Sequence, residues 1–273
     1  MSGKRVTSLL TSTFGSLFDR ATKHPFLKAA GQGQISKTIL SEWLAQDRLY
    51  AQSYIRFIGL LLSKVCLPSG NPNTRKSQEP TTEQRVFDIL VEALVGIQSE
   101  LRFFESTAAE YGLDLTALPR DEVEGEGTNG IFGPSPITRA YIDLFMSAGS
   151  AGVSLLEGMS VLFATEYCYL QAWKYAAFIS MSTSTTTGLV GDLDTDADGG
   201  ALRRKFIPNW SSLEFEQFVL RLQDVTDELG GRVKGAEEGE RERGKCVGWW
   251  KQVLWLEERF WPQVEVDIDG DEG

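Results

Sequence analysis

The chain has 273 residues, of which 42% are hydrophobic and 24% are charged, as is typical of a folded globular protein rather than a disordered one. At this length one hydrophobic core is close to its upper size limit, so we expect one large domain. The formal net charge of -11 argues against nucleic acid and anionic membranes as partners, because both are bound through clustered Lys and Arg.

Three scattered cysteines, Cys66, Cys168 and Cys246, form no CxxC pair and no disulfide pattern, which favours a reducing compartment. The first residues, MSGKRVTSLLTSTF, lack the apolar segment of a signal peptide. No stretch reaches the roughly 18 apolar residues of a membrane span. We therefore expect a cytoplasmic protein without membrane contact.

Apolar residues recur at spacings of three and four along most of the chain, the pattern of helices with one buried face. The first long helix should begin at Ser41 as its N-cap and end near Pro68. Thr81 or Thr82 should cap the next helix, and Gly112 should close it. In chain order we expect helices over residues 41–67, 83–111, 137–147, 150–178, 212–229 and 245–261.

Segments rich in Gly, Thr and charge interrupt this pattern and should form loops near residues 68–82, 120–135, 182–203 and 231–244. One of them contains DLDTDADGG, which is similar to a calcium-binding loop. The closing Glu at the twelfth position is absent, so a solvated loop is the favoured interpretation. Strands are nearly absent, which predicts a single all-α domain over residues 1–262 followed by an acidic tail, 263–273.

His24 is the only histidine, which excludes a zinc site with several imidazoles and a di-iron site built from two Glu-x-x-His pairs. The sequence shows no GxSxG turn, no signal of a Ser-His-Asp triad and no glycine-rich phosphate loop. We therefore expect no metal and no cofactor. The remaining candidates for chemistry are carboxylates, hydroxyls and aromatic rings.

Asp47 interrupts the apolar face of the first long helix, and Tyr50 follows three residues later on the same face. A buried carboxylate is costly unless it is hydrogen-bonded, paired or placed at the wall of a wet cavity. Two interpretations therefore stay open. Asp47 forms a structural ion pair, for example with Arg56 or Arg139, or it lines a ligand cavity.

A second polar cluster lies in the apolar stretch of residues 158–178, where Thr165, Glu166 and Tyr169 fall within about one and a half helical turns. Tyr141 is a candidate to face the same interior. Tyrosines in helical bundles are commonly core residues with a tethered hydroxyl. The alternative is a shared aromatic pocket with Asp47, suited to a flat polar heterocycle that stacks on rings and offers nitrogens to carboxylates.

The stretch HPFLKAAGQGQISKTILSEWLAQDRLY (24–50) resembles the opening of the TenA/thiaminase II family. The resemblance continues in order and covers nearly the whole chain. It implies a multi-helical bundle of the heme-oxygenase-like type, shared with PqqC, with a pocket that binds and hydrolyses pyrimidines derived from thiamin. The further matching stretches are ELRFFESTAAEYGLD (100–114), PITRAYIDLF (136–145), LFATEYCYLQAW (162–173) and NWSSLEFEQFV (209–219).

By position, the resemblance assigns Asp47 to the carboxylate that holds the aminopyrimidine, and Tyr50 to the ring stacked beside it. Tyr141 and Tyr169 match two further tyrosines of the family. Trp210 stands where the family has a tyrosine, and it can stack on a ligand but cannot act as a phenolic acid.

Two catalytic positions depart from the family. Thr165 stands where the nucleophilic cysteine is expected, four residues before Tyr169, and Cys168 is turned to another face of the helix. The glutamate expected in the final helix is not found in VGWWKQVLW. Glu166 is therefore the candidate acid or base in its place.

These matches and departures leave two functions. The first is a TenA-like protein that binds an aminopyrimidine or related heterocycle and hydrolyses it without cysteine in thiamin salvage, with Asp47 and Glu166 as catalytic candidates. The second is a non-catalytic TenA-fold binding or interaction protein. A heme ligand at His24 is the weaker alternative, because Pro25 follows it directly. Family members commonly form homo-oligomers, and the inserted loops leave that state open here.

Overall fold

The computed structural model describes residues 5–70, 79–118, 131–186 and 193–264, and these residues contain helices and no strand. This confirms the predicted all-α fold class. The long helices are α4 (Lys37–Leu62), α5 (Thr82–Tyr111), α7 (Pro136–Gly149), α8 (Leu155–Thr186), α10 (Leu213–Gly231) and α11 (Ala236–Phe260). The shorter ones are α1 (Val6–Thr11), α2 (Gly15–Thr22), α3 (Pro25–Gly31) and α9 (Ile207–Trp210).

Side-chain caps fix where several helices begin. Thr81 caps α5 in a reciprocal capping box with Gln84, and Gly112 closes the same helix in the left-handed conformation, both as the sequence predicts. The N-cap of α4 is Ser36 rather than Ser41, because the Ser36 hydroxyl already accepts the Ile39 N–H. Ser41 lies one turn inside the helix.

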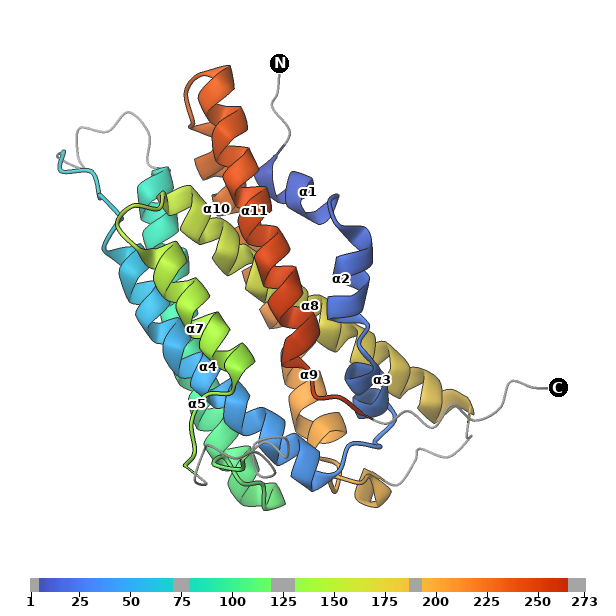
Figure 1. Ribbon diagram of the computed structural model, residues 1–273. Helices are drawn as coiled ribbons and strands as arrows, with labels where there is room; N and C mark the ends of the chain where they lie inside the picture. The colour runs from blue at the N-terminus through green and yellow to red at the C-terminus, as the bar shows by residue number, and fades with distance from the viewer. Residues whose placement is uncertain (1–4, 71–78, 119–130, 187–192, 265–273) are drawn as a thin grey trace.

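The helix α8 runs through the middle of the molecule and packs against α3, α10 and α11 (Figure 1). On the other side, α4 packs between α5 and α7. A helix that is apolar on most of its faces is expected at such a central position. The core has two parts, an aliphatic and aromatic cluster around α8 and α11, and a cluster rich in tryptophan at the α3–α9 end.

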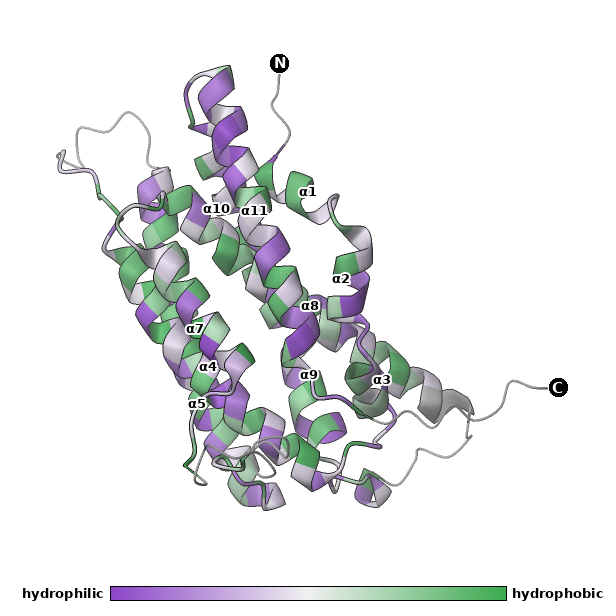
Figure 2. Cartoon of the chain, viewed as in Figure 1, coloured by the Kyte–Doolittle hydropathy of each residue, from purple (hydrophilic) through white to green (hydrophobic). Residues whose placement is uncertain are grey.

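The helix α11 begins at Ala236, so the predicted loop at 231–244 is wrong for most of its length. Its first turns are strongly hydrophilic (Figure 2), which hides the helical pattern from an analysis of apolar periodicity. Ion pairs three residues apart stabilise these turns, including Glu238 with Arg241 and Glu242 with Lys245.

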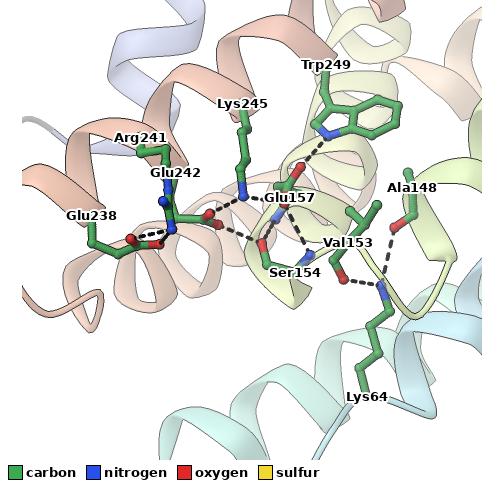
Figure 3. A network of polar contacts seen from close by, with 10 residues as sticks. All are labelled: Lys64, Ala148, Val153, Ser154, Glu157, Glu238, Arg241, Glu242, Lys245 and Trp249. Atoms are coloured by element: carbon green, nitrogen blue, oxygen red, sulfur yellow. Dashed lines mark hydrogen bonds and ion pairs between the residues drawn. The ribbon is translucent and has the colours of Figure 1, made fainter.

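A buried polar network then fixes this end of α11 against the start of α8 (Figure 3). The Glu242 carboxylate accepts hydrogen bonds from Lys245 Nζ (2.5 Å) and Ser154 Oγ (2.9 Å). The Glu157 carboxylate accepts from Trp249 Nε1 at 2.8 Å. The contacts of Glu242 with Ser154 and of Glu157 with Trp249 join residues far apart in the sequence, so no local pattern predicts them.

The predicted loop at 182–203 is also wrong in part. The helix α8 continues to Thr186, and a short 3-10 turn, η2 (Leu193–Thr195), and a π-helical turn, η3 (Leu202–Phe206), occupy its far end. Asp196 forms a buried ion pair with Arg203, and the Asp198 carboxylate accepts the N–H groups of Gly200 and Leu202. In the described part of this segment these two aspartates are therefore engaged in local structure.

The predicted loops near 68–82 and 120–135 carry no helix at residues 68–70, 79–81 and 131–135, and their other residues lie outside the described ones, apart from the start of α5 at Thr82. Most of the acidic tail lies outside them as well. Among the described helices, none is both long and apolar enough to span a bilayer.

Candidate functional site

A cavity of about 470 Å³ lies between α4, α5, α8 and the α9–α10 segment. Its volume is in the range of small-molecule pockets. Aromatic rings and carboxylates make up most of its wall. The residues on which its chemistry depends are Asp47, Tyr50, Glu100, Thr165, Glu166, Tyr169 and Trp210, so five of the six predicted ligand-binding residues, together with Glu166, meet at one cavity.

Asp47 lies at the cavity wall with only 3% of its surface exposed. Its Oδ2 accepts a hydrogen bond from the Tyr169 hydroxyl at 3.2 Å. Burial, and secondarily the charge of Glu100, raises the pKa of Asp47 well above its usual value. Within the described residues no ion pair joins Asp47 to Arg56 or Arg139, so the structure supports the cavity interpretation over the ion-pair one.

The neighbouring polar residue, Gln46, has a structural role. Its side chain donates to the Gly133 carbonyl oxygen (3.1 Å) and accepts from the Ser135 N–H (2.8 Å) and the Thr138 hydroxyl (2.8 Å). Gln46 thus fixes the start of α7 against α4. Asp47, one residue on, takes no part in these contacts and faces the cavity.

Glu166 reaches the cavity from α8, where the Tyr54 hydroxyl hydrogen-bonds its carboxyl. Burial raises the pKa of Glu166 to about 7, against the lowering effect of the Tyr54 hydrogen bond. A carboxyl with this pKa exchanges protons near neutral pH, as a general acid or base requires.

Glu100 on α5 is a third carboxyl at the wall, and no pattern in the sequence predicts it there. Trp210 Nε1 donates a hydrogen bond to its Oε1, and Asn209 Nδ2 donates to its Oε2 at 3.3 Å. Burial raises the pKa of Glu100 to about 7, although both hydrogen bonds lower it. The Trp210 ring also lies beside Tyr169, with centroids 5.4 Å apart.

Tyr141 does not line the cavity. It is buried behind Tyr50, whose ring it meets edge-on at a centroid distance of 5.1 Å. Its hydroxyl donates to Glu257 Oε1 at 2.5 Å. Tyr141 is therefore one layer removed from any ligand, and Tyr50 separates it from the cavity.

The final helix does carry a buried glutamate near the site, Glu257, which does not line the cavity but lies behind it with Tyr141. It lies in α11, only 4% exposed, and burial raises its pKa to about 8. No glutamate stands next to the pair Trp249–Trp250, whereas Glu257 precedes a second aromatic pair, Phe260–Trp261, by three residues. That second aromatic pair was the signal that would have found it.

Neither candidate nucleophile is activated. The Thr165 hydroxyl lines the cavity and donates to the Leu162 carbonyl oxygen at 3.0 Å within its own helix. Cys168 is fully buried in the core, and burial raises its thiol pKa well above the usual value. The thiol is thus kept protonated and away from the cavity, which agrees with the helical geometry predicted for it.

The comparisons with known proteins agree on the family. The sequence matches the family model described as the TENA/THI-4/PQQC family over residues 15–265. A protein of Fusarium pseudograminearum named "Probable transcription factor" is 31% identical over 270 residues, covering 91% of this chain and 50% of that protein. A soybean (Glycine max) protein named "Probable bifunctional TENA-E protein" is 22% identical over 159 residues, 58% of each chain. This chain therefore spans about half the length of the curated relatives it matches.

Solved structures show the same fold. A TenA homologue from Pyrococcus furiosus superposes with a TM-score of 0.67 at 23% identity, covering 94% of this chain and 98% of that one. A TenA homologue from P. horikoshii OT3 gives a TM-score of 0.62 at 17% identity, with coverages of 94% and 98%. At these identities the likeness establishes the fold alone, which is the all-α heme-oxygenase-like bundle that the resemblance implied.

Proposed function

Because this chain belongs to the TENA/THI-4/PQQC family, we propose that it binds an aminopyrimidine or a related heterocycle in the cavity beside Asp47. The observation that carries the proposal is the placement of a buried carboxyl among aromatic rings at an accessible cavity wall. A carboxyl so desolvated is costly when charged, and a protonatable ring nitrogen or an exocyclic amine would offset that cost.

Stacking would supply the rest of the affinity. Tyr50 and Tyr169 flank Asp47 at the wall, and Trp210 packs against Tyr169. A flat heterocycle gains dispersion and quadrupole contacts on such rings, of the order of 1 kcal/mol for each favourable pair. The hydrogen bond from the Tyr169 hydroxyl fixes the Asp47 carboxyl, so that it presents its remaining oxygen to the ligand.

Hydrolysis in thiamin salvage is the finer part of the proposal, with Glu166 as the acid or base. Its pKa of about 7 suits the removal of a proton from an attacking water molecule. When the C–N bond of thiamin breaks, its electrons stay with the thiazolium nitrogen, so the thiazole leaves as a neutral ring. Water rather than a protein nucleophile would attack the ring, because the Thr165 hydroxyl donates its hydrogen bond to the Leu162 carbonyl oxygen of its own helix and not to a base.

The alternative function is binding without turnover. The observation that favours it is the same absence of an activated nucleophile at the wall, where Thr165 is hydrogen-bonded within its own helix and Cys168 is buried in the core. Product analysis after incubation with thiamin separates the two functions, because only the hydrolase releases the pyrimidine.

The binding proposal is tested by calorimetric titration of the full chain with 4-amino-2-methylpyrimidine. Asp47→Asn keeps the size of the side chain but cannot ionise against a cationic ligand group, and we expect it to weaken binding by about ten-fold or more, the usual cost of a charged hydrogen bond. Asp88→Asn, an exposed change on α5, is the matched control and should bind as the unchanged protein does. If the Asp47→Asn protein binds the pyrimidine as tightly as the unchanged protein, the proposal is wrong.

A further inference from the structure

Every charged side chain at the cavity wall is acidic. Within the described residues the wall carries five carboxyls and no Lys, Arg or His. One of them, Glu92, is neutralised at the rim by an ion pair with Arg221. The three deepest, Asp47, Glu100 and Glu166, take part in no ion pair in the part of the chain that the structure describes.

These three carboxyls disfavour one another's charge. The charge of Glu100 raises the pKa of both Asp47 and Glu166, after burial itself. An anionic ligand group would add to this repulsion and would find no cation at the wall to compensate for lost hydration. A cationic ligand group would relieve it, and the gain would be largest in the low-dielectric cavity.

Among these carboxyls, Glu100 is the one whose hydrogen bonds hold it in place to receive a cationic ligand group. It comes from α5, whereas Asp47 and Glu166 come from α4 and α8, so the three approach the cavity from three different helices. The indole N–H of Trp210 and the amide of Asn209 each donate to one of its oxygens, which fixes its orientation. An ionised carboxylate has about four acceptor positions, so two donors leave room for a ligand.

We propose that Glu100 is a second anchor and the specificity-determining residue of the site: its carboxylate holds the cationic part of a ligand whose ring lies at Asp47, and it rejects phosphate esters. This inference rests on the proposed function, since it concerns the same cavity. Asp47 would recognise the heterocycle, and Glu100 would recognise the charged group attached to it.

The test is calorimetric titration of the full chain with three probes: 4-amino-2-methylpyrimidine, which is mostly neutral at pH 7.5, the cation thiamin, and thiamin monophosphate. We expect the unchanged protein to bind thiamin at least about ten-fold more tightly than its monophosphate. Glu100→Gln should weaken thiamin binding by about ten-fold and change binding of the neutral pyrimidine by less than about two-fold.

Two further variants keep the result interpretable. Glu105→Gln makes the same chemical change at an exposed position of α5 and should leave all three affinities unchanged. Glu100→Asp keeps the negative charge and should retain the preference for the cation over the phosphate ester. Thermal unfolding of each variant shows whether it is folded before its affinities are compared.

The outcomes separate this inference from the proposed function. If Asp47→Asn loses the neutral pyrimidine while Glu100→Gln leaves thiamin binding unchanged, or weakens both probes equally, the role of Glu100 is overturned and the proposed function stands. Tight binding of thiamin monophosphate by the unchanged protein would also overturn it. If the unchanged protein binds none of the three probes, both ideas fail together.

Discussion

Thr165 and Glu166 are adjacent in α8 and both reach the cavity, yet their environments differ. The Thr165 hydroxyl is hydrogen-bonded to the Leu162 carbonyl oxygen at 3.0 Å, a local contact that does nothing to activate it. The Glu166 carboxyl is held by Tyr54, and burial brings its pKa to about 7. If the cavity supports turnover, the second residue and not the first should limit it.

We therefore predict opposite effects of two variants on the hydrolysis of thiamin at neutral pH. Thr165→Val, which keeps the shape of the side chain, should retain activity within about three-fold, whereas Glu166→Gln should lose about 100-fold, as expected for a general acid or base. Release of the pyrimidine, followed by chromatography, measures both. A large loss in the threonine variant alone would point to a hydroxyl nucleophile instead.

At the scale of the helices, two glycines differ in what surrounds them. A Cβ at Gly31, the last residue of α3, would lie 2.5 Å from the Ala176 carbonyl oxygen and 2.8 Å from the Ile179 Cβ. The glycine thus permits the close contact between α3 and α8. A Cβ at Gly59, inside α4, would meet nothing within 4 Å.

Alanine should therefore have opposite effects at the two positions. Gly31→Ala is expected to lower the free energy of unfolding by about 1–3 kcal/mol through overpacking against backbone. Gly59→Ala should raise it by up to about 1 kcal/mol, because alanine is the better helix former. Urea unfolding monitored by circular dichroism compares them, and a stable Gly31→Ala protein would contradict the close contact.

Local signals were enough to predict the six long helices, although not every one of their bounds, and the short helices α1, α2, α3 and α9 were not predicted. The cap at Thr81 and the closing Gly112 lie in the chain itself, so the bounds of α5 were predictable. The early start of α11 was not, because its first turns are held by ion pairs and by the contact of Glu242 with Ser154 across the molecule. The first turns of α11 have the amino-acid composition of a loop, so composition and apolar periodicity predict a loop there.

At the scale of the whole molecule, the interior holds carboxyls that prefer to be protonated. Burial raises the pKa of Glu257 to about 8, and of Glu100 and Glu166 to about 7, from a usual value of 4.5. Between about pH 4.5 and pH 8 the folded chain therefore binds more protons at these groups than the unfolded chain does. Their contribution to stability is complete below pH 4.5 and is lost as the pH rises.

We predict that the melting temperature falls from pH 5 to pH 8. Each carboxyl that is protonated in the folded chain and ionised in the unfolded chain lowers the free energy of unfolding by about 1.4 kcal/mol per pH unit. Glu257→Gln cannot ionise and can still accept the hydrogen bond of Tyr141, so its melting temperature should depend less steeply on pH. Calorimetric scans across this range provide the test, and parallel curves for the two proteins would refute the assignment.

The residues of the site could be predicted only where a polar residue interrupts the apolar face of a helix. Asp47 and Tyr50 stand out in this way, as do Glu166 and Tyr169. Glu100 does not, because a glutamate in a long amphipathic helix is normally a solvated residue. Its place in the cavity follows from how α5 packs against the segment that carries Trp210, and no spacing along one helix encodes that contact.

The hydrogen bond between Trp210 and Glu100 gives the site a built-in optical signal. The indole N–H of Trp210 is held by the carboxyl that lines the cavity, and its ring lies against Trp173, with centroids 4.4 Å apart. Indole absorption and emission respond to the charge and hydrogen bonding around the ring. A molecule that approaches Glu100 therefore changes the light emitted by this tryptophan, and occupancy of the cavity can be followed without any attached dye.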